Sequence, residues 1–377
     1  MNANDAQSRR PAKPGSDTFE SRTWARRSLA QGEVLVGVED LERSLPSWIE
    51  DGPFDLVAIW PADRPSVAIV RGFGLDLRLD ESIEVRPLSI AVDERELEAP
   101  IELNRVRFEP TPDPRTQPID DQLPENQPEL RLSRGNESFV VGRAGMEYQD
   151  LLPKRHGGRF VVSRIRVGVD GPVPDFVHRH HIRGQLLICT AGRVRVVYEN
   201  QGEPIWMEAG DAFLQPSGIR HRVLESEGGL EVIELGCPAV HATEIEHEFD
   251  LPNDEVDAAR RWAGQRFSYS RERDGDYVSV EGGFERHRTE VLEASDGYCD
   301  LSWWRADSDG SVGFLACDAE LTLLHVVEGG VRIAGEALQE GDSIVLPPSD
   351  PLELGTAVRS SRCFVARFGP LGSAGLS

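Results

Sequence analysis

Three histidines between Gly171 and His221 have the type and spacing of metal ligands. His178 and His180 are two residues apart in a segment that reads as extended, so both side chains point to one face of a strand. His221 follows a Gly-Asp turn and a Pro-x-Gly turn on a later strand. Imidazoles that converge from neighbouring strands, with the amide oxygen of Gln185 nearby, suit a transition metal. The stretch therefore predicts a metal site held by a small β-barrel.

Short segments of alternating or continuous hydrophobicity surround this cluster and predict an all-β chain. They are separated by Gly, Pro or Asn-Gln-Gly turns, and many short strands at regular spacing indicate a sandwich or a barrel. The strand-like segments are residues 54–60, 66–70, 75–79, 101–108, 159–168, 185–189, 193–198, 212–214 and 230–235.

An internal repeat indicates that this β unit occurs twice. Residues 187–196 resemble residues 324–333, and residues 210–217 match residues 341–348 at the same spacing. Two copies of one supersecondary unit predict two related barrels in one chain.

Composition shifts suggest the boundaries between these parts. A polar stretch at 1–30 is expected to be a disordered tail, followed by a β-rich extension at 31–135 that ends in a Pro-rich linker. The first barrel is expected at 136–250 and the second at 266–377. Between them, residues 251–265 are expected to hold a linker helix that starts after Asn253 as its N-cap.

Charge and cysteine usage exclude several classes of partner. The formal net charge of the 377 residues is −24, and such an acidic surface repels phosphate backbones, so nucleic acid is not expected as a partner. The five cysteines are scattered and form no CxxC pair, which favours buried thiols in a reducing compartment. No apolar stretch reaches membrane-spanning length, and the N-terminus lacks a signal peptide core. We therefore expect a soluble cytoplasmic protein that acts on a small molecule, with no membrane partner.

Two linked motifs in this stretch resemble those of the cupin superfamily. The first motif is matched with Gln replacing the usual Glu and with one extra residue before the first histidine. The second motif is matched at the family spacing, with Glu standing where Asn is usual. The matching residues are Gly171, His178, His180, Gln185 and Gly192 for the first motif, and Gly210, Pro216, Gly218, His221 and Glu225 for the second.

The resemblance covers roughly residues 140 to 370 and implies a bicupin, with two double-stranded β-helix or jelly-roll barrels and an N-terminal β-rich extension. It implies one divalent transition metal (Fe, Zn, Ni or Cu, which the sequence does not distinguish) and a homodimer. The implied metal ligands are His178, His180, Gln185 and His221. In the second copy the same positions hold Leu315, Cys317, Thr322 and Leu352, so that barrel is expected to be metal-free.

Among cupin activities, the resemblance favours a dioxygenase-like oxidoreductase acting on an anionic or chelating substrate, such as a phenol or enol. Gln185 leaves the full charge of a divalent ion uncompensated, which favours an anionic substrate and also raises a Zn-type cyclase or isomerase as an alternative. A non-catalytic ligand-binding or sensor bicupin is the alternative from another class. Glu225, four residues beyond His221, is expected to share its inward face and to move a proton, unless it lies at an exposed strand end.

Other polar and aromatic residues carry weaker indications. Tyr198 and Gln215 are candidates to line the pocket, whereas His181 is expected to point away from it. The acidic neighbours of His241 and His247 indicate solvated charge, and Trp303-Trp304 is expected in a core or interface.

Overall fold

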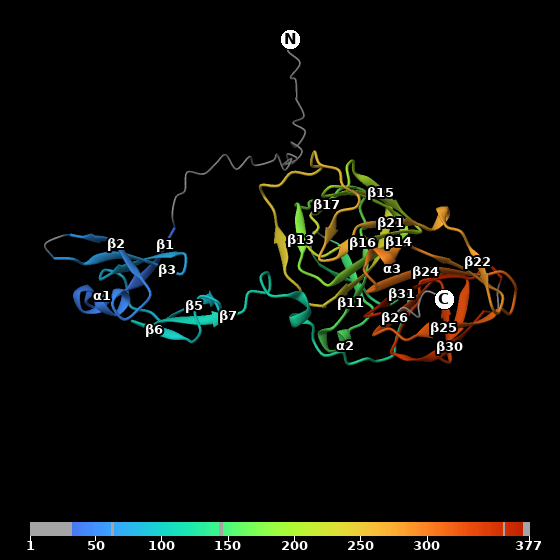
Figure 1. Cartoon of the computed structure of the whole chain (residues 1–377), viewed down its shortest axis with the longest axis horizontal. Helices are drawn as coiled ribbons and strands as arrows, with labels where there is room; N and C mark the ends of the chain where they lie inside the picture. The colour runs from blue at the N-terminus through green and yellow to red at the C-terminus, as the bar shows by residue number, and fades with distance from the viewer. Residues whose placement is uncertain (1–31, 62–63, 143–145, 357–358, 372–377) are drawn as a thin grey trace, which may run out of the picture. The chain divides into compact units, whose positions relative to one another are not determined.

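The computed structural model describes residues 32–61, 64–142, 146–356 and 359–371, and the chain divides into two compact units (Figure 1). The N-terminal unit ends at Pro112, and the barrel unit begins at Asp113. The expected disordered tail, residues 1–30, lies outside the described residues. The predicted boundary at residue 135 is wrong, because residues 113–135 belong to the same compact unit as the barrels.

The N-terminal unit contains two small sheets and one helix. The four-stranded sheet has the order β1-β4-β3-β2, and the three-stranded sheet has the order β5-β7-β6. The elements are β1 (Glu33–Gly37), α1 (Leu41–Ile49), β2 (Asp55–Trp60), β3 (Val67–Gly72), β4 (Leu75–Asp80), β5 (Leu88–Asp93), β6 (Ile101–Leu103) and β7 (Val106–Thr111).

Helix α1 is an element that the strand-based sequence prediction missed. Asp40 caps it by accepting a hydrogen bond from the Arg43 backbone N–H at 3.0 Å. Leu41 and Trp48 face the core of the unit, and the Trp48 ring meets Phe54 edge-on with centroids 5.2 Å apart. The sequence signals for this helix were Asp40 as a cap residue and the apolar residues Leu41 and Trp48, seven positions apart.

The first barrel is built on two long strands that run through an 11-stranded sheet with the main order β21-β16-β14-β17-β11-β10-β9. These long strands are β14 (Gly184–Tyr198) and β17 (His221–Cys237). The other elements are β9 (Val140–Val141), β10 (Glu147–Asp150), the short turn α2 (Arg155–Gly158), β11 (Val161–Arg166), β12 (Gly171–Pro172), β13 (His178–His180), β15 (Ile205–Glu208), β16 (Asp211–Gln215), β18 (Thr243–Ile245) and β21 (Ser268–Arg271).

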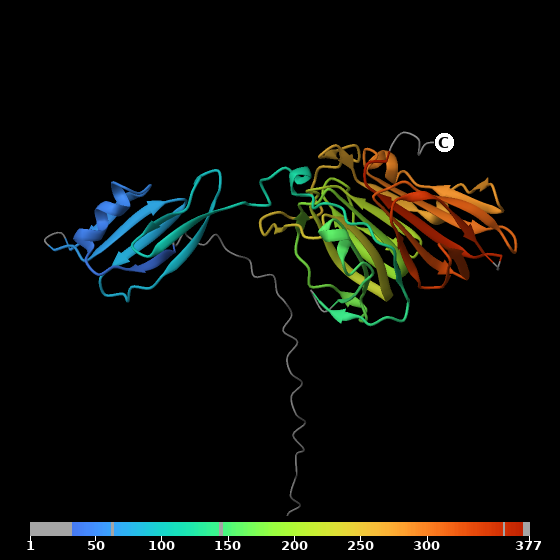
Figure 2. The same cartoon turned by 90° about the horizontal axis from the view of Figure 1, so that it is seen from below.

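The second barrel consists of a seven-stranded sheet, β22-β23-β24-β31-β26-β29-β8, and a four-stranded sheet, β25-β30-β27-β28. It lies beside the first barrel within the barrel unit (Figures 1 and 2). Its elements are β8 (Arg131–Ser133), η3 (Glu272–Asp274), β22 (Val278–Val280), β23 (Phe284–Arg288), α3 (Val291–Ala294), β24 (Cys299–Ala306), β25 (Val312–Cys317), β26 (Leu321–Glu328), β27 (Gly330–Ile333), β28 (Glu336–Gln339), β29 (Ser343–Leu346), β30 (Ser349–Gly355) and β31 (Arg362–Phe368).

The two barrels exchange strands, which the sequence boundaries did not predict. Strand β8 precedes the first barrel in the chain but pairs with β29 of the second, and β21 follows the first barrel but pairs with β16 within it. The repeated Gly-Asp turns bind the exchanged segments. Asp211 accepts a hydrogen bond from Tyr269 of β21 at 2.7 Å, and Asp342 accepts one from the Gly135 N–H, just after β8, at 2.9 Å.

A shared apolar core joins the barrels. It contains Leu186 and Ile233 from the first barrel together with Trp303, Leu323 and Phe364 from the second. Trp304 points into the separate core of the second barrel, so both tryptophans are core residues as expected. All five cysteines are buried and unpaired.

The linker helix predicted at 251–265 is not formed. Residues 254–260 have no regular structure apart from a bend at 254 and a turn at 258–259, and the first regular elements beyond them are β19 (Arg261–Trp262) and β20 (Gln265–Arg266). Asn253 uses its side chain to accept from the Asn200 N–H at 2.8 Å, and the Asn200 side chain donates to the Glu255 carbonyl at 3.3 Å. These contacts hold the segment against the turn after β14, and tertiary contacts of this kind override a weak helix preference.

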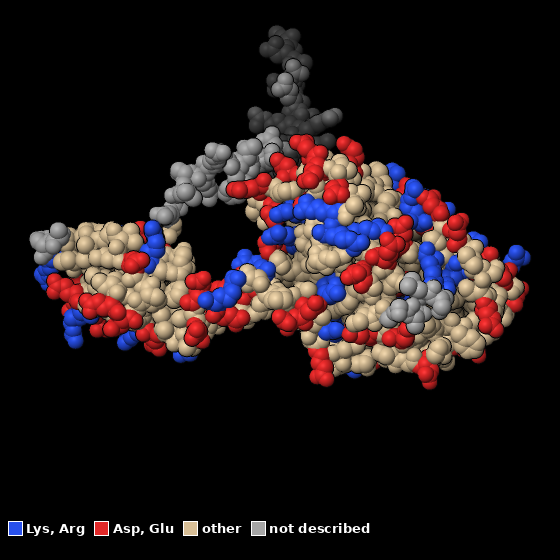
Figure 3. Space-filling model, in the orientation of Figure 1, with Lys and Arg blue, Asp and Glu red and all other residues tan. Residues whose placement is uncertain are grey.

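Acidic and basic side chains are interspersed over the face of the barrels seen in Figure 3. No helix in the described part of the chain combines the length and the apolar character needed to cross a membrane.

Candidate functional site

The structure brings three of the four predicted ligands together in the first barrel. His178 on β13 pairs directly with His221 on β17, and the two ring centroids are 4.3 Å apart. The centroid of the His180 ring lies 5.0 Å from that of His178 and 5.2 Å from that of His221. One ring nitrogen from each histidine lies within 4.8 Å of the others. This spacing allows all three to bind one ion.

The Nδ1 atoms of two of these histidines have partners that fix their protons. His178 Nδ1 lies 2.8 Å from the Phe176 carbonyl oxygen, and His221 Nδ1 lies 3.1 Å from the Ile219 carbonyl oxygen. A carbonyl only accepts, so Nδ1 must donate in both rings and Nε2 carries the lone pair. A backbone acceptor behind the ring is the usual way in which a metal-binding imidazole is oriented.

Asp175 stabilises the strand that carries the first histidine. Its carboxylate lies 3.6 Å from His178 Nδ1 and accepts a hydrogen bond from the Val223 N–H of β17 at 3.1 Å. It therefore ties the segment before β13 to the strand of His221. The sequence analysis did not single out Asp175, although its position three residues before a predicted ligand was a usable signal.

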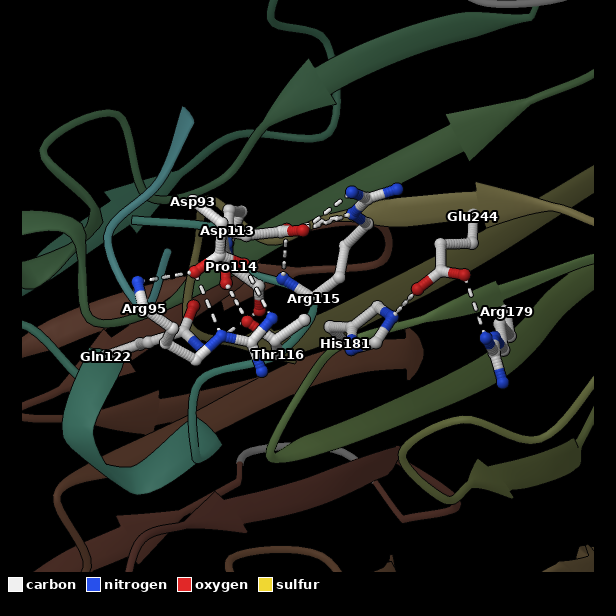
Figure 4. A network of polar contacts seen from close by, with 10 residues as sticks. All are labelled: Asp93, Arg95, Asp113, Pro114, Arg115, Thr116, Gln122, Arg179, His181 and Glu244. Carbon is white, nitrogen blue, oxygen red and sulfur yellow. Dashed lines mark hydrogen bonds and ion pairs between the residues drawn. The ribbon is translucent and has the colours of Figure 1, made fainter. Parts of the chain in front are cut away.

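His180 is held from the other side by β18, which pairs with β13. The Thr243 hydroxyl lies 2.9 Å from His180 Nδ1. The adjacent His181 points away from the triad and contacts the Glu244 carboxylate, which also accepts from Arg179 at 2.8 Å (Figure 4). Hydrogen bonds from Arg179 and His181 lower the pKa of Glu244. The prediction that His181 points away from the site is therefore confirmed.

Gln185 presents an amide whose orientation is fixed. The residue is 3% exposed, and its Nε2 donates to Glu234 at 2.6 Å. An ionised carboxylate only accepts, so the nitrogen must face Glu234 and Oε1 must face away. This Oε1 is buried and has no hydrogen-bond partner among the described residues. A buried acceptor without a partner is costly, so the amide oxygen fits the role of a metal ligand.

Register places Gln185 in the same interior as the histidines. It pairs with Gln215 across β14 and β16, so the two side chains share a face. Gln215 Nε2 donates to the Tyr198 hydroxyl at 2.9 Å, and the Tyr198 ring stacks on His221 at 24° with centroids 5.6 Å apart. Burial raises the pKa of Tyr198 well above its ordinary value. Tyr198 and Gln215 thus lie beside the triad, as the sequence suggested.

Glu225 does not continue the inward face of His221, and that expectation is wrong. Opposite Arg195 and Val196 of β14, the pairing of β17 shifts from Glu225 to Val223, so one extra residue interrupts the alternation. The Glu225 side chain is 31% exposed and forms an ion pair with Arg195 at 3.0 Å. Besides Asp175, the carboxylate of Glu234 faces a predicted ligand, Gln185, and the sequence analysis did not consider it.

A fourth histidine lies beside the triad. The His241 ring is 5.3 Å from that of His180, and its Nδ1 lies 3.0 Å from the Pro238 carbonyl oxygen. Its assignment to solvated charge was therefore wrong, because the chain after β17 returns across the barrel. His247 is exposed and contacts Phe176 with centroids 5.8 Å apart.

The second barrel has no histidine at the positions where the first has ligands. Leu315 pairs with Leu352 across β25 and β30, as His178 pairs with His221 in the first barrel. Leu315 and Cys317 are buried in the core of this barrel, and Thr322 is also buried. Within the described residues, this barrel holds no group of metal-binding side chains comparable to the triad.

The two halves of the barrel unit therefore share the same cross-strand pairing in two all-β barrels. Among the described residues, the histidine triad lies in the first barrel, and the second barrel has no counterpart to it.

Comparison with known proteins gives resemblance in structure only. No protein-family model and no curated protein matches the sequence. Salicylate 1,2-dioxygenase from Pseudaminobacter salicylatoxidans is 16% identical with a TM-score of 0.49, and the match covers 68% of this chain and 89% of the dioxygenase chain. The protein Ylba from E. coli is 11% identical with a TM-score of 0.47, and the match covers 67% of this chain and 98% of the Ylba chain. A Bacillus subtilis oxalate decarboxylase variant is 12% identical with a TM-score of 0.46, and the match covers 63% of this chain and 76% of the decarboxylase chain. At this distance no substrate transfers to this chain.

Proposed function

We propose that the first barrel is the active site of a metal-dependent enzyme that oxygenates a small, anionic, chelating substrate of the phenol or enol type. The observation that carries the proposal is the convergence of His178, His180 and His221 with two of their Nδ1 atoms held by carbonyls. Such a set binds Fe, Zn, Ni or Cu in preference to Mg or Ca. The fourth ligand in this proposal is Gln185 Oε1.

The charge of the site supports an anionic substrate. All four proposed ligands are neutral, so the charge of a divalent ion would be offset only by carboxylates behind the ligands, such as Glu234 behind Gln185 and Asp175 beside His178. A bound metal ion would act as a Lewis acid that orients and polarises the substrate. In dioxygenation both atoms of O₂ enter the substrate, and the substrate supplies the electrons, so no external reductant is required.

A cyclase or isomerase that uses Zn is the second candidate. The neutral amide of Gln185 favours it, because an ion without a charged ligand is a stronger Lewis acid, which stabilises an enolate without any change of oxidation state. A site that binds the ligand and returns it unchanged would instead be a sensor.

Metal analysis and oxygen uptake together separate these functions. The full chain is purified without added metal, its metal is identified, and it is mixed with salicylate and gentisate, whose carboxylate and ortho hydroxyl form a chelating pair. A redox-active metal with oxygen uptake supports the oxygenase, whereas Zn without uptake supports the cyclase or isomerase. Absence of metal from a protein that also fails to bind added Fe²⁺, Co²⁺ or Zn²⁺ would overturn the proposal.

A further inference from the structure

We propose that Glu234 is a positioning residue that turns the amide oxygen of Gln185 toward the metal site. The inference rests on the proposed function, since it concerns how the fourth ligand is presented. Glu234 lies on β17, diagonally across from Gln185 on β14, and its carboxylate accepts from Gln185 Nε2 at 2.6 Å.

Strand alternation places the Glu234 side chain inside the first barrel. Its neighbours Ile233 and Leu235 point into the core shared by the two barrels, whereas Val232 belongs to the apolar cluster within the first barrel. Glu234 therefore shares the inner face of β17 with Val232, and this face is turned toward Gln185.

A comparison with Gln215 shows why a carboxylate is needed. The Gln215 amide meets the Tyr198 hydroxyl, which can either donate or accept, so that contact permits both orientations of the amide. The Gln185 amide meets a carboxylate, which accepts only. Glu234 thus selects the one orientation of Gln185 that presents oxygen, a possible metal ligand, in place of a non-coordinating NH₂ group.

Glu234 also places a negative charge one hydrogen bond away from the proposed ligand Gln185. A carboxylate bound to the metal would place that charge on the ion, whereas the Gln-Glu pair holds it behind a neutral ligand. Partners of metal ligands at this distance typically change metal affinity by about 10- to 100-fold when removed.

Metal titration of the full chain tests this assignment. The Kd for Co²⁺ and Zn²⁺ is measured for the chelator-treated wild type, for Glu234→Ala and Glu234→Gln, and for Glu227→Gln as a control on the exposed side of the same strand. We expect about 10- to 100-fold weaker binding for Glu234→Ala, a smaller loss for Glu234→Gln, and no change for the control. The Co²⁺ absorption spectrum should also change in the Glu234 variants, because the ligand set is altered.

Changing both residues separates positioning from a general effect on folding. A carboxylate at position 185 presents oxygen in either orientation, so Glu234→Gln should weaken metal binding less in the Gln185→Glu background than in the wild type. Non-additivity of this kind identifies a coupled pair. Wild-type affinity in Glu234→Ala, or an equal effect of Glu234→Gln in the two backgrounds, would overturn the role of Glu234. Loss of metal binding by the wild type itself would instead overturn the proposed function.

Discussion

His178 and His221 lie opposite each other on β13 and β17, and each ring contacts the carbonyl of the residue two positions earlier in the chain. The two ligands therefore have the same local construction, although 43 residues separate them (221 − 178). Because each backbone holds its own ring, the pair is oriented before any ion arrives. Such preorganisation reduces the entropy lost on binding.

The double variant His178→Ala/His221→Ala should lose metal while keeping its fold. Removing two of three imidazoles leaves too few donors for tight binding. Elemental analysis should detect near-stoichiometric metal in the wild type and only traces in the variant. Metal at about 100 times its Kd should stabilise the wild type by about 2.7 kcal/mol and the variant not at all. His247→Ala, which changes an exposed histidine outside the triad, serves as the control. Equal metal content in the wild type and the double variant would contradict the assignment.

Thr243→Val should weaken metal binding by releasing the His180 ring. The hydroxyl lies 2.9 Å from His180 Nδ1, and valine has the same shape without the hydrogen bond. We expect a loss of affinity of up to about 10-fold, at the lower end of the range for such partners. Thr243→Ser keeps the hydroxyl and should bind metal as the wild type does. If valine and serine behave alike, Thr243 does not orient the ligand.

The ligand positions were predictable because they depend on local spacing. His178 and His180 share a face through strand alternation, and the repeat located the apolar counterparts Leu315 and Leu352 before their pairing was known. Glu225 was misplaced because a bulge in β17 is a property of its pairing with β14 and leaves no clear mark in the sequence. Glu234 was missed for a related reason, since its contact with Gln185 depends on the register of two strands.

Contacts distant in sequence also explain the errors in the fold. Asn253 has the residue type of a helix cap, but it bonds Asn200 instead. The pairing of β8 with β29 joins segments about 210 residues apart, so no local pattern announces it.

Asp342→Ala should destabilise the junction formed by β8. The carboxylate accepts from the Gly135 N–H at 2.9 Å, from the Gln339 N–H at 3.0 Å and from Arg134 at 2.7 Å. Although burial opposes them, these hydrogen bonds lower the pKa of Asp342. Leaving the two N–H groups without their acceptor should cost about 1–3 kcal/mol in urea unfolding. Asp350→Ala, at an exposed carboxylate, should change little. A similar effect of the two substitutions would show that the junction does not contribute to stability.

His325 should make the barrel unit sensitive to acid. It is 2% exposed, its Nδ1 lies 2.9 Å from the Ser343 hydroxyl, and burial, assisted by the nearby Arg164 charge, lowers its pKa to about 3. The ordinary value is 6.5, so between pH 6.5 and about 3 the unfolded chain binds a proton that the folded chain does not. The contribution of His325 to the free energy of unfolding is therefore fully present above pH 6.5. As the pH is lowered toward 3, it falls by about 1.4 kcal/mol per pH unit.

The variant His325→Gln isolates this contribution, because glutamine remains neutral at every pH. At pH 7 the variant should be less stable than the wild type, since it disturbs the packing against Phe364. The difference should shrink as the pH is lowered from 6.5 to 4.5, because only the wild type loses stability through this site. Denaturant unfolding at several pH values measures the difference directly. The exposed His247→Gln controls for the loss of an imidazole and should show a constant difference. Parallel curves for His325→Gln and the wild type would mean that His325 is protonated in the folded protein.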